Sequence, residues 1–376
     1  MRRELVTRRF EETFGGSPTL WARAPGRVDL MGSHTDYNLG FVLTLAISKD
    51  TWVAARPRED AIVRLCSANL DASESFDLRK IPSASGRWGD YPRGVAWALA
   101  REGLPLRGFE GVIHSTIPIG GGLSSSAALE CAIAVTFRAL GLWEMSGERL
   151  AMLCQRAENE YVGMKCGVLD QFSSCLGRAG CALMLDCRDL STRPVRLAEG
   201  IRVVICDTKS PRKLVGGEYG ARRARCEEGA ARIGVAALRD ATMADVAILK
   251  GEVRKRCEFI VGENARAVEL AGALAAGDRA AIRRLCAESF AGARDLFEIC
   301  SPSMLMMMEA MTAAPGAIGA RQAGAGFGGC MVAFVDTDKA DAFAAAVAGR
   351  YRDATGLIPE VFSVEAADGA GVMHAD

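Results

Sequence analysis

The stretch that most constrains this chain is Pro118–Glu130, in which three glycines are followed, after a single leucine, by three serines. Glycine adopts backbone dihedrals that are closed to other residues, and serine is a preferred helix N-cap. Glu110–Ile117 before it is predicted to be a strand, and the mostly apolar Ala127–Leu140 after it is typical of a buried helix. A flexible loop that opens a helix presents unpaired N–H groups to an anion, and phosphate is the usual one.

An ordinary capped turn would account for one glycine and one hydroxyl, but not for Gly120–Gly122 together with Ser124–Ser126. The loop lacks the lysine of a GxxxxGK[ST] phosphate loop and the spaced glycines of a dinucleotide fingerprint. We therefore predict a phosphate-binding loop of another geometry.

A second polar stretch, residues 25–38, follows the predicted strand Thr19–Ala24 and precedes another strand. Polar groups concentrated between core strands are costly unless they face a ligand. A surface turn would explain the tip at Tyr37–Gly40, but it would not explain Arg27 or His34. The stretch is therefore predicted to bind a ligand.

Two single acids stand out further along the chain. Ser146 begins a predicted helix over Glu148–Val162, where Glu158 falls at the edge of an apolar stripe. A carboxylate in that place should be paired, protonated or bound to metal. Asp170 follows a glycine within Cys166–Phe172 and fits an acid at the edge of a pocket, although an aspartate near a helix start is the commoner explanation.

The totals disfavour several function classes. Lysine plus arginine number 46, as do aspartate plus glutamate, so no global charge favours nucleic acid or an anionic membrane. The charged N-terminal segment is not expected to be a signal peptide, and no apolar run approaches the ~18 residues of a membrane helix. Thirteen cysteines without a CxxC pair indicate free thiols in a reducing cytoplasm, and only three histidines argue against a multi-histidine metal site.

Three stretches stand in a fixed order: the polar loop, the glycine–serine loop and a late glycine cluster, Gly319–Cys330. This arrangement resembles the GHMP small-molecule kinases and, among them, the galactokinases. Pro25–Ile47 is similar to the galactokinase signature, Pro118–Glu130 to the family's ATP loop, Cys166–Phe172 to its catalytic aspartate segment, and the late cluster to its third motif. The resemblance covers essentially the whole chain.

The resemblance implies an α+β fold of two domains, residues 1–195 and 196–376, with the active site between them. The turn-rich join Cys187–Gly200 is the best candidate for the boundary. The implied activity is an ATP-dependent, Mg²⁺-requiring sugar 1-kinase that phosphorylates the anomeric hydroxyl of galactose or a galactose-like aldose. Its implied partners are the sugar and ATP, with no nucleic acid and no membrane, and we expect a cytoplasmic monomer or weak dimer.

The implied site residues fall into four groups. In the catalytic pair, Asp170 would accept the proton of the anomeric hydroxyl or orient that hydroxyl, and Arg27 would lie beside it. The other groups are the sugar contacts Ser33, His34, Thr35, Asp36, Gly167 and Tyr219; the nucleotide contacts Trp88, Gly120, Gly121, Gly122, Leu123, Ser124, Ser125 and Ser126; and the Mg²⁺ ligands Ser126 and Glu158.

The chain departs from the galactokinase pattern at the sugar loop. Ser33 stands where the family has a glutamate directed at the sugar's C6 hydroxyl, Asp29 where asparagine is usual, and Ala323 where threonine is usual. L-Arabinose is galactose without its C6 group, and the plant arabinokinases also lack the glutamate. The alternatives are therefore an L-arabinokinase or a kinase for a C6-modified sugar such as a uronate.

Two other function classes compete with this prediction. A non-catalytic regulator that binds sugar and ATP is disfavoured, because all the phosphoryl-transfer residues are present. A dinucleotide oxidoreductase would use Gly324–Gly329, but that cluster precedes a strand and does not open a helix.

Overall fold

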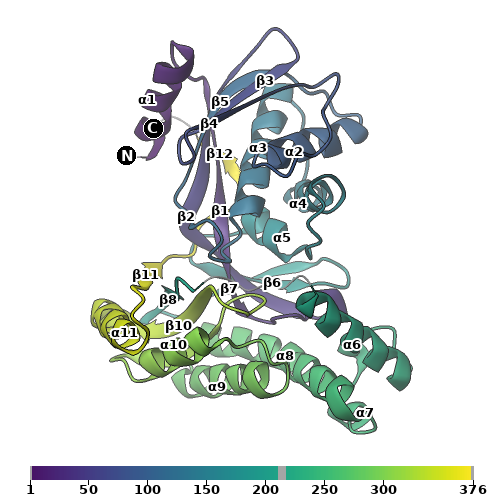
Figure 1. Ribbon diagram of the computed structural model, residues 1–376, viewed down its shortest axis with the longest axis vertical. Coiled ribbons are helices and arrows are strands. Elements are labelled where there is room, and N and C mark those ends of the chain that lie inside the picture. Colours follow the sequence, from purple (N-terminus) through teal and green to yellow (C-terminus); the bar gives the residue numbers. More distant parts are fainter. Residues whose placement is uncertain (1, 211–216, 374–376) are drawn as a thin grey trace.

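The computed structural model describes residues 2–210 and 217–373. Its strands form two β-sheets, one in each half of the molecule, and helices cover both of them (Figure 1). The expected α+β architecture in two parts is confirmed. None of the helices in the described part of the chain is long and apolar enough to cross a bilayer.

The large sheet forms the upper half in Figure 1. Its strands are β1 (Leu20–Met31), β2 (Phe41–Pro57), β3 (Ile62–Ser67), β4 (Ala72–Asp77), β5 (Phe109–Ser115), β6 (Cys181–Asp186), β7 (Thr192–Arg196) and β12 (Gly371–Val372). They run in the order β12-β1-β2-β5-β3-β4, with β6 paired to β2 and β7 paired to β6. The first part of β2 pairs with β6 and the second part with β5, which makes this long strand the spine of the sheet.

Side chains along β2 alternate between the two faces of the sheet. On one face Ala54 packs with Val6 and Phe10 of α1 (Arg2–Phe14). On the other face Val53 and Ala55 pack against a layer of helices. That layer consists of α2 (Asp90–Arg101), α3 (Ser125–Gly141), α4 (Gly147–Arg156) and α5 (Leu169–Leu176).

The small sheet of the lower half has the order β11-β8-β10-β9. Its strands are β8 (Ile201–Asp207), β9 (Ala317–Gln322), β10 (Cys330–Asp336) and β11 (Glu360–Val364). Two helices cover one face, α10 (Pro302–Thr312) and α11 (Ala340–Thr355), and two cover the other, α8 (Gly251–Ala276) and α9 (Arg279–Asp295). Beside α8 lie α6 (Glu218–Ile233) and α7 (Met243–Val246), and single turns occupy η3 (Leu238–Asp240) and η4 (Thr337–Lys339).

One hydrophobic core joins the two halves. Leu30 of β1 and Leu45 of β2 belong to the same buried cluster as Leu270 of α8 and Val332 of β10. The lower ends of β1 and β2 are therefore packed into the half built on the small sheet, and the loop between them lies at the boundary.

The domain boundary between residues 195 and 196 stays a prediction. β7 ends at Arg196 and the small sheet begins at Ile201, close to that position. The chain then returns across it, because β12 joins the large sheet, where Val372 pairs with Ala22.

A buried ion pair lies where the halves meet. Arg321 of β9 donates from Nη2 to Oε1 of Glu263 on α8 at 2.7 Å, and both side chains are fully buried. The same oxygen accepts the backbone N–H groups of Gly32 and Ser33 at 3.3 and 3.4 Å, so it also holds the β1–β2 loop. Burial alone would raise the pKa of Glu263, but the charges of Arg321 and Arg266 outweigh it and keep that pKa below its ordinary value.

Loss of Arg321 should therefore be costly. Arg321→Leu removes the cation at Oε1 of the buried Glu263 and leaves that carboxylate, among the described residues, with Arg266 alone on Oε2. The free energy of unfolding should fall by about 3–5 kcal/mol. The control is Arg279→Leu, which breaks the Arg279–Asp336 pair, whose side chains are 47% and 37% exposed, and should cost less than about 1 kcal/mol. Urea unfolding followed by circular dichroism measures both variants, and equal losses would contradict the argument.

Candidate active site

Arg27 of β1 brings three separate segments together. Its Nε and Nη2 lie 2.9 and 2.6 Å from Oδ1 of Asp170, in the first turn of α5. Its Nη1 donates to the carbonyl oxygen of Gly122 in the glycine–serine loop at 2.7 Å. The pairing of β1 with β2 shifts register on both sides of Arg27, and such bulges re-aim side chains beside functional sites. The predicted catalytic pair is thus in contact, directly against the predicted phosphate loop.

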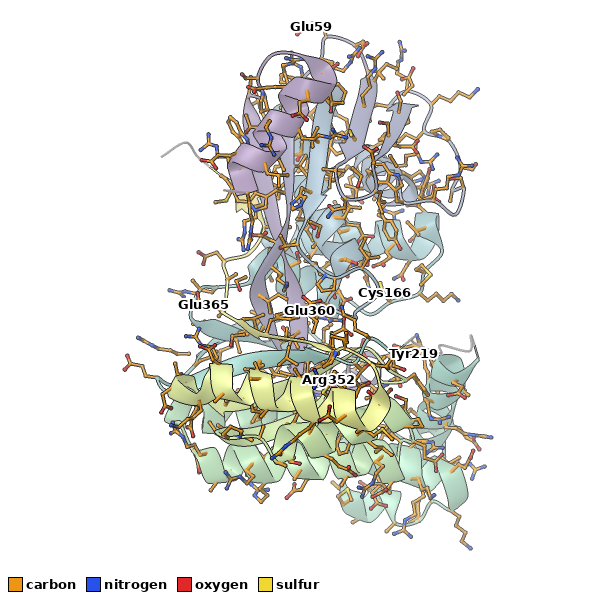
Figure 2. All side chains as sticks on the ribbon, turned by 60° about the vertical axis from the view of Figure 1, so that its left-hand side comes forward. Glu59, Cys166, Tyr219, Arg352, Glu360 and Glu365 are labelled. Carbon is orange, nitrogen blue, oxygen red and sulfur yellow. The ribbon has the colours of Figure 1, made fainter. Side chains whose placement is uncertain are left out.

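Asp36 begins η1 (Asp36–Asn38), the single turn in the β1–β2 loop, and faces Gly167. A Cβ built on Gly167 would lie 2.0 Å from Oδ2 of Asp36, so a side chain there would clash with the carboxylate. Burial, and then the charge of Asp170, raise the pKa of Asp36 to about 6. Figure 2 shows Cys166, the neighbour of Gly167, at the lower edge of the upper half and Tyr219 below it, in the lower half.

Two of the predicted sugar contacts are engaged with the protein itself. Oγ of Ser33 donates to Oδ2 of Asp29 at 3.0 Å and accepts from Nη2 of Arg321 at 2.8 Å. Oγ1 of Thr35 lies 2.7 Å from two carbonyl oxygens of its own loop. Both side chains are buried and fix the loop from inside. Their roles as sugar contacts stay predictions.

His34 and Tyr219 belong to an aromatic cluster beside the loop, with ring centroids 5.3 Å apart. Nδ1 of His34 lies 2.9 Å from the hydroxyl of Tyr37, and Nε2 lies 3.0 Å from the carbonyl oxygen of Ala325. Because a carbonyl oxygen only accepts, Nε2 carries a proton, and in the neutral imidazole Nδ1 then accepts from the tyrosine hydroxyl. Burial, and then the charge of Asp36, raise the pKa of Tyr219, which keeps its hydroxyl protonated beside the β1–β2 loop.

The glycine–serine loop has the open backbone that its sequence predicts. Gly120 and Gly122 have φ angles of 78° and 79°. Apart from its two chain neighbours, no group of the described residues lies within 4 Å of a Cβ built on Gly120. Ser124 occupies the N-cap of α3 with a φ of 58°, but its hydroxyl caps no N–H, contrary to the expected serine cap. Its buried Oγ has no hydrogen-bond partner among residues 2–210 and 217–373. A left-handed residue with an unpaired hydroxyl at a helix start is typical of a ligand site.

Glu158 lies in η2 (Ala157–Val162), where α4 continues as a π-helical turn and not as the predicted α-helix. Such turns concentrate at functional sites. The carboxylate is mostly buried and accepts from Nε2 of Gln171 at 2.7 Å and from Sγ of Cys166 at 3.2 Å. The nearby hydroxyl of Ser126 favours its charged form. Burial raises its pKa.

A cavity of about 230 Å³ lies beside the start of α3. Trp88, the predicted adenine neighbour, lines it together with Tyr91, Ile119 and Ser126. A cavity with aromatic walls next to a phosphate loop suits a nucleoside.

Comparison with known proteins decides the family. Residues 8–57 match the galactokinase galactose-binding signature, residues 90–178 the N-terminal domain of GHMP kinases, and residues 270–353 their C-terminal domain. The galactokinases of Chloroflexus aggregans and Streptomyces coelicolor are 44% and 42% identical over 97% of this chain and over 96% and 97% of their own lengths. The chain belongs to the galactokinase family of GHMP kinases.

Solved structures agree with this assignment. Lactococcus lactis galactokinase complexed with galactose is 31% identical, with a TM-score of 0.93 over 98% of this chain and 99% of that one. The mevalonate kinase of Methanococcus jannaschii, 17% identical with a TM-score of 0.68 over 94% of this chain and 99% of its own, shares the fold. This member of the galactokinase family is a kinase, an enzyme that transfers a phosphoryl group.

Two buried polar residues of this galactokinase-family kinase were not predicted to belong to its site. Nε2 of Gln171 donates both to Glu158 and to Glu130 of α3, and Gln171 and Glu130 are each 0% exposed. Burial raises the pKa of Glu130 well above its ordinary value. A signal was present in the sequence: Glu130 is an acid in a mostly apolar helix, and such a group is costly without a partner.

The raised pKa of Asp36 makes a testable statement about stability. A carboxyl group whose pKa rises from 3.8 to about 6 on folding binds its proton more tightly in the folded state, so its contribution to stability falls as the pH rises from about 4 to about 6. Asp36→Asn removes this contribution. The Tm of the variant relative to wild type should therefore increase over that pH range and level off above it.

The control for this experiment is Asp60→Asn. Asp60 is exposed, and its hydrogen bond with Arg58 lowers its pKa to about 2. The contribution of Asp60 to stability is then lost only as the pH falls below about 4. The Tm difference between Asp60→Asn and wild type should therefore be flat between pH 4 and 7. An equally flat profile for Asp36→Asn in thermal unfolding scans would show that folding does not raise the pKa of Asp36.

Proposed function

We propose that this kinase transfers the γ-phosphoryl group of ATP to the anomeric hydroxyl of galactose. The single observation that carries the proposal is the contact of Arg27 with both Asp170 and the carbonyl oxygen of Gly122. It places a carboxylate and a cation directly at the loop that would bind the phosphates. The galactokinases that share 42–44% of their residues with the chain support galactose as the sugar.

Asp170 is the residue that would meet the reacting hydroxyl. Both nitrogens of Arg27 contact Oδ1, so Oδ2 would accept the hydrogen of the anomeric hydroxyl, and the side chain is 24% exposed. As the sugar oxygen forms its bond to the γ-phosphorus, its O–H bond breaks and the bond from that phosphorus to ADP breaks. Arg27 would stabilise the charge on the transferring group, since phosphoryl transfer is mainly positioning and charge neutralisation.

The nucleotide would occupy the cavity beside α3 and the open loop before it. The adenine would lie near Trp88 and Tyr91, and the phosphates would meet the backbone of Gly120–Ser126, where the hydroxyl of Ser124 is unpaired among the described residues. Binding of phosphate at this helix start is favoured by its unpaired N–H groups.

Ser126 and Glu158 would hold Mg²⁺, because the two side chains lie near each other and carboxylate and hydroxyl oxygens are ligands that this cation prefers. The described residues contain no cluster of three or more histidine, cysteine or acidic side chains placed to hold a metal. A kinase Mg²⁺ needs none, since it is usually bound by one or two carboxylates and by the substrate's phosphates. When bound, it would neutralise phosphate charge.

A second candidate sugar is L-arabinose, and the hydrogen bonds of Ser33 favour it. The short hydroxyl that replaces the family glutamate is already bonded to Asp29 and Arg321. It would therefore contribute little to a C6 hydroxyl, which L-arabinose lacks. A C6-modified sugar such as a uronate, or a non-catalytic regulator, are weaker alternatives. We expect the enzyme to act in the cytoplasm as a monomer or weak dimer.

Asp170→Asn tests the chemistry. The amide keeps the shape of the side chain but loses the charge that attracts the hydroxyl proton, so kcat should fall by roughly 10²–10⁴-fold. The Kd for ATP, measured by calorimetry, should stay within about threefold of wild type. A near-normal kcat would refute the role of Asp170, and a wild-type protein that binds both substrates without releasing ADP would instead be a regulator.

Ser33 and Asp29 must be changed together to test sugar choice. Ser33→Glu alone would add a carboxylate beside Asp29 and Glu263, whereas Asp29→Asn with Ser33→Glu keeps the number of acids constant. A regained hydrogen bond to C6 is worth about 1–3 kcal/mol, so the double variant should raise the kcat/KM ratio of galactose to L-arabinose by about ten- to a hundredfold.

The matched control for this pair is Asp29→Asn alone, which should leave the sugar ratio within about threefold of wild type. If the wild-type enzyme strongly prefers galactose and the double variant changes the ratio by less than about twofold, residue 33 does not read C6. The enzyme is then a galactokinase without relaxed specificity.

A further inference from the structure

Gln171, the residue after the proposed catalytic aspartate, joins two acids inside the upper half. Its Nε2 lies 2.7 Å from Oε2 of Glu158 and 2.9 Å from Oε2 of Glu130. The three residues come from three elements: Glu130 from α3, Glu158 from the π-turn η2, and Gln171 from α5. All three are buried, Glu130 and Gln171 completely.

An amide nitrogen carries two hydrogens, and here each acid takes one of them. The other end of the amide, Oε1 of Gln171, has no hydrogen-bond partner within residues 2–210 and 217–373. The N–H side of the amide is therefore held in place mainly by the two carboxylates it faces, with a longer contact of 4.0 Å from Nε2 to Sγ of Cys166. Glu158 accepts its hydrogen bond on the same oxygen that meets Cys166.

An amide group is nearly symmetric in shape, so half a turn exchanges its oxygen and its nitrogen with little steric change. If residue 130 offered no acceptor, one amide hydrogen would be left buried and without a hydrogen bond. The orientation with N–H toward Glu158 would then be stabilised by one carboxylate and not by two. In the reversed orientation the partial negative charge of Oε1 would meet the carboxylate of Glu158.

We infer that Glu130 is a positioning residue for the metal-binding carboxylate, because it fixes the amide of Gln171 with its N–H side toward Glu158. The inference rests on the proposed Mg²⁺ site of Ser126 and Glu158. What Glu130 supplies is a hydrogen-bond acceptor at a fixed place and not its charge. Groups of this kind behind a ligand set its orientation, and their loss commonly weakens metal binding.

The test compares variants at residue 130 for metal binding. Mn²⁺, a paramagnetic substitute for Mg²⁺, is titrated into the full-length enzyme with a non-hydrolysable ATP analogue, and bound metal is measured by electron paramagnetic resonance. Glu130→Leu should weaken Mn²⁺ binding by about tenfold or more. Glu130→Gln, whose amide oxygen still accepts, should stay within about threefold of wild type, and the Mg²⁺ concentration for half-maximal rate should follow the same order.

The matched control is Thr136→Val, at another fully buried polar residue of α3, whose hydroxyl bonds the backbone of its own helix at Ala132. It should lower stability without changing the Kd for Mn²⁺. Gln171→Leu should weaken Mn²⁺ binding as Glu130→Leu does, and the double variant should be no weaker than either, because both remove the same contact. If Glu130→Leu does not fold, Gln171→Leu and Glu130→Gln carry the test.

Three results would overturn the inference: a Kd within twofold of wild type for Glu130→Leu, or for Gln171→Leu where Glu130→Leu does not fold; a Glu130→Gln variant that loses at least tenfold in affinity; or additive losses in the double variant. Glu158→Gln separates this failure from failure of the proposed metal site. If Glu158→Gln weakens Mn²⁺ binding and the Glu130 variants do not, only the positioning role is wrong. If Glu158→Gln has no effect either, the metal site itself lies elsewhere.

Discussion

The β1–β2 loop of this kinase depends on one buried carboxylate. Oε1 of Glu263 receives the N–H groups of Gly32 and Ser33, the guanidinium of Arg321 and the hydroxyl of Ser289. An ionised group with no exposure to water is stable only when an opposite charge and hydrogen-bond donors compensate it. Because those donors come from β9, α9 and the β1–β2 loop, the same contact that stabilises the charge also fixes the loop of the upper half to the helices of the lower half.

The boundary above that contact is rich in acids whose charges are poorly compensated. Burial raises the pKa of Asp29, Asp36, Glu130 and Glu158, while Arg27 contacts Asp170. Perturbed carboxyl groups gathered at one place are typical of a site that is completed by its ligands. Sugar hydroxyls would donate hydrogen bonds to Asp36 and Asp170, and a cation would compensate the charge of Glu158. Without its ligands, the protein therefore leaves the negative charges of this region only partly compensated.

Much of this arrangement could be predicted from the sequence, because the residues concerned are local. The glycine–serine loop, the strand before it and the buried helix after it lie within about thirty consecutive residues, and their dihedral and capping preferences are properties of the residues themselves. Glu158 could likewise be recognised as a carboxylate on an apolar stripe that needs a hydrogen-bond partner or a metal ion. Family resemblance then brought Arg27, Asp36 and Asp170 into one site, and the structure places them together.

What could not be predicted depends on contacts between distant parts of the chain. The engagement of Ser33 by Arg321 joins residues 288 positions apart, and the bridge from Gln171 to Glu130 spans 41. Neither has a local pattern. The π-turn at Glu158 was missed for a related reason, since a continuous α-helix satisfies the same apolar spacing and only the surrounding packing selects the wider turn. The hydroxyl of Ser124 was misjudged as a cap because the residue is in the left-handed region.

The donors around the two key carboxylates differ in a way that follows from their proposed tasks. Asp170 is met by a guanidinium, whose charge also suits a transferring phosphoryl group. Glu158 accepts hydrogen bonds from an amide and a thiol, which orient it but carry no charge. An arginine or lysine in place of Gln171 would orient Glu158 equally well, but it would also neutralise the carboxylate and repel the cation that the carboxylate is proposed to bind. A neutral donor behind Glu158 is therefore what a metal ligand requires, and a charged donor belongs beside Asp170.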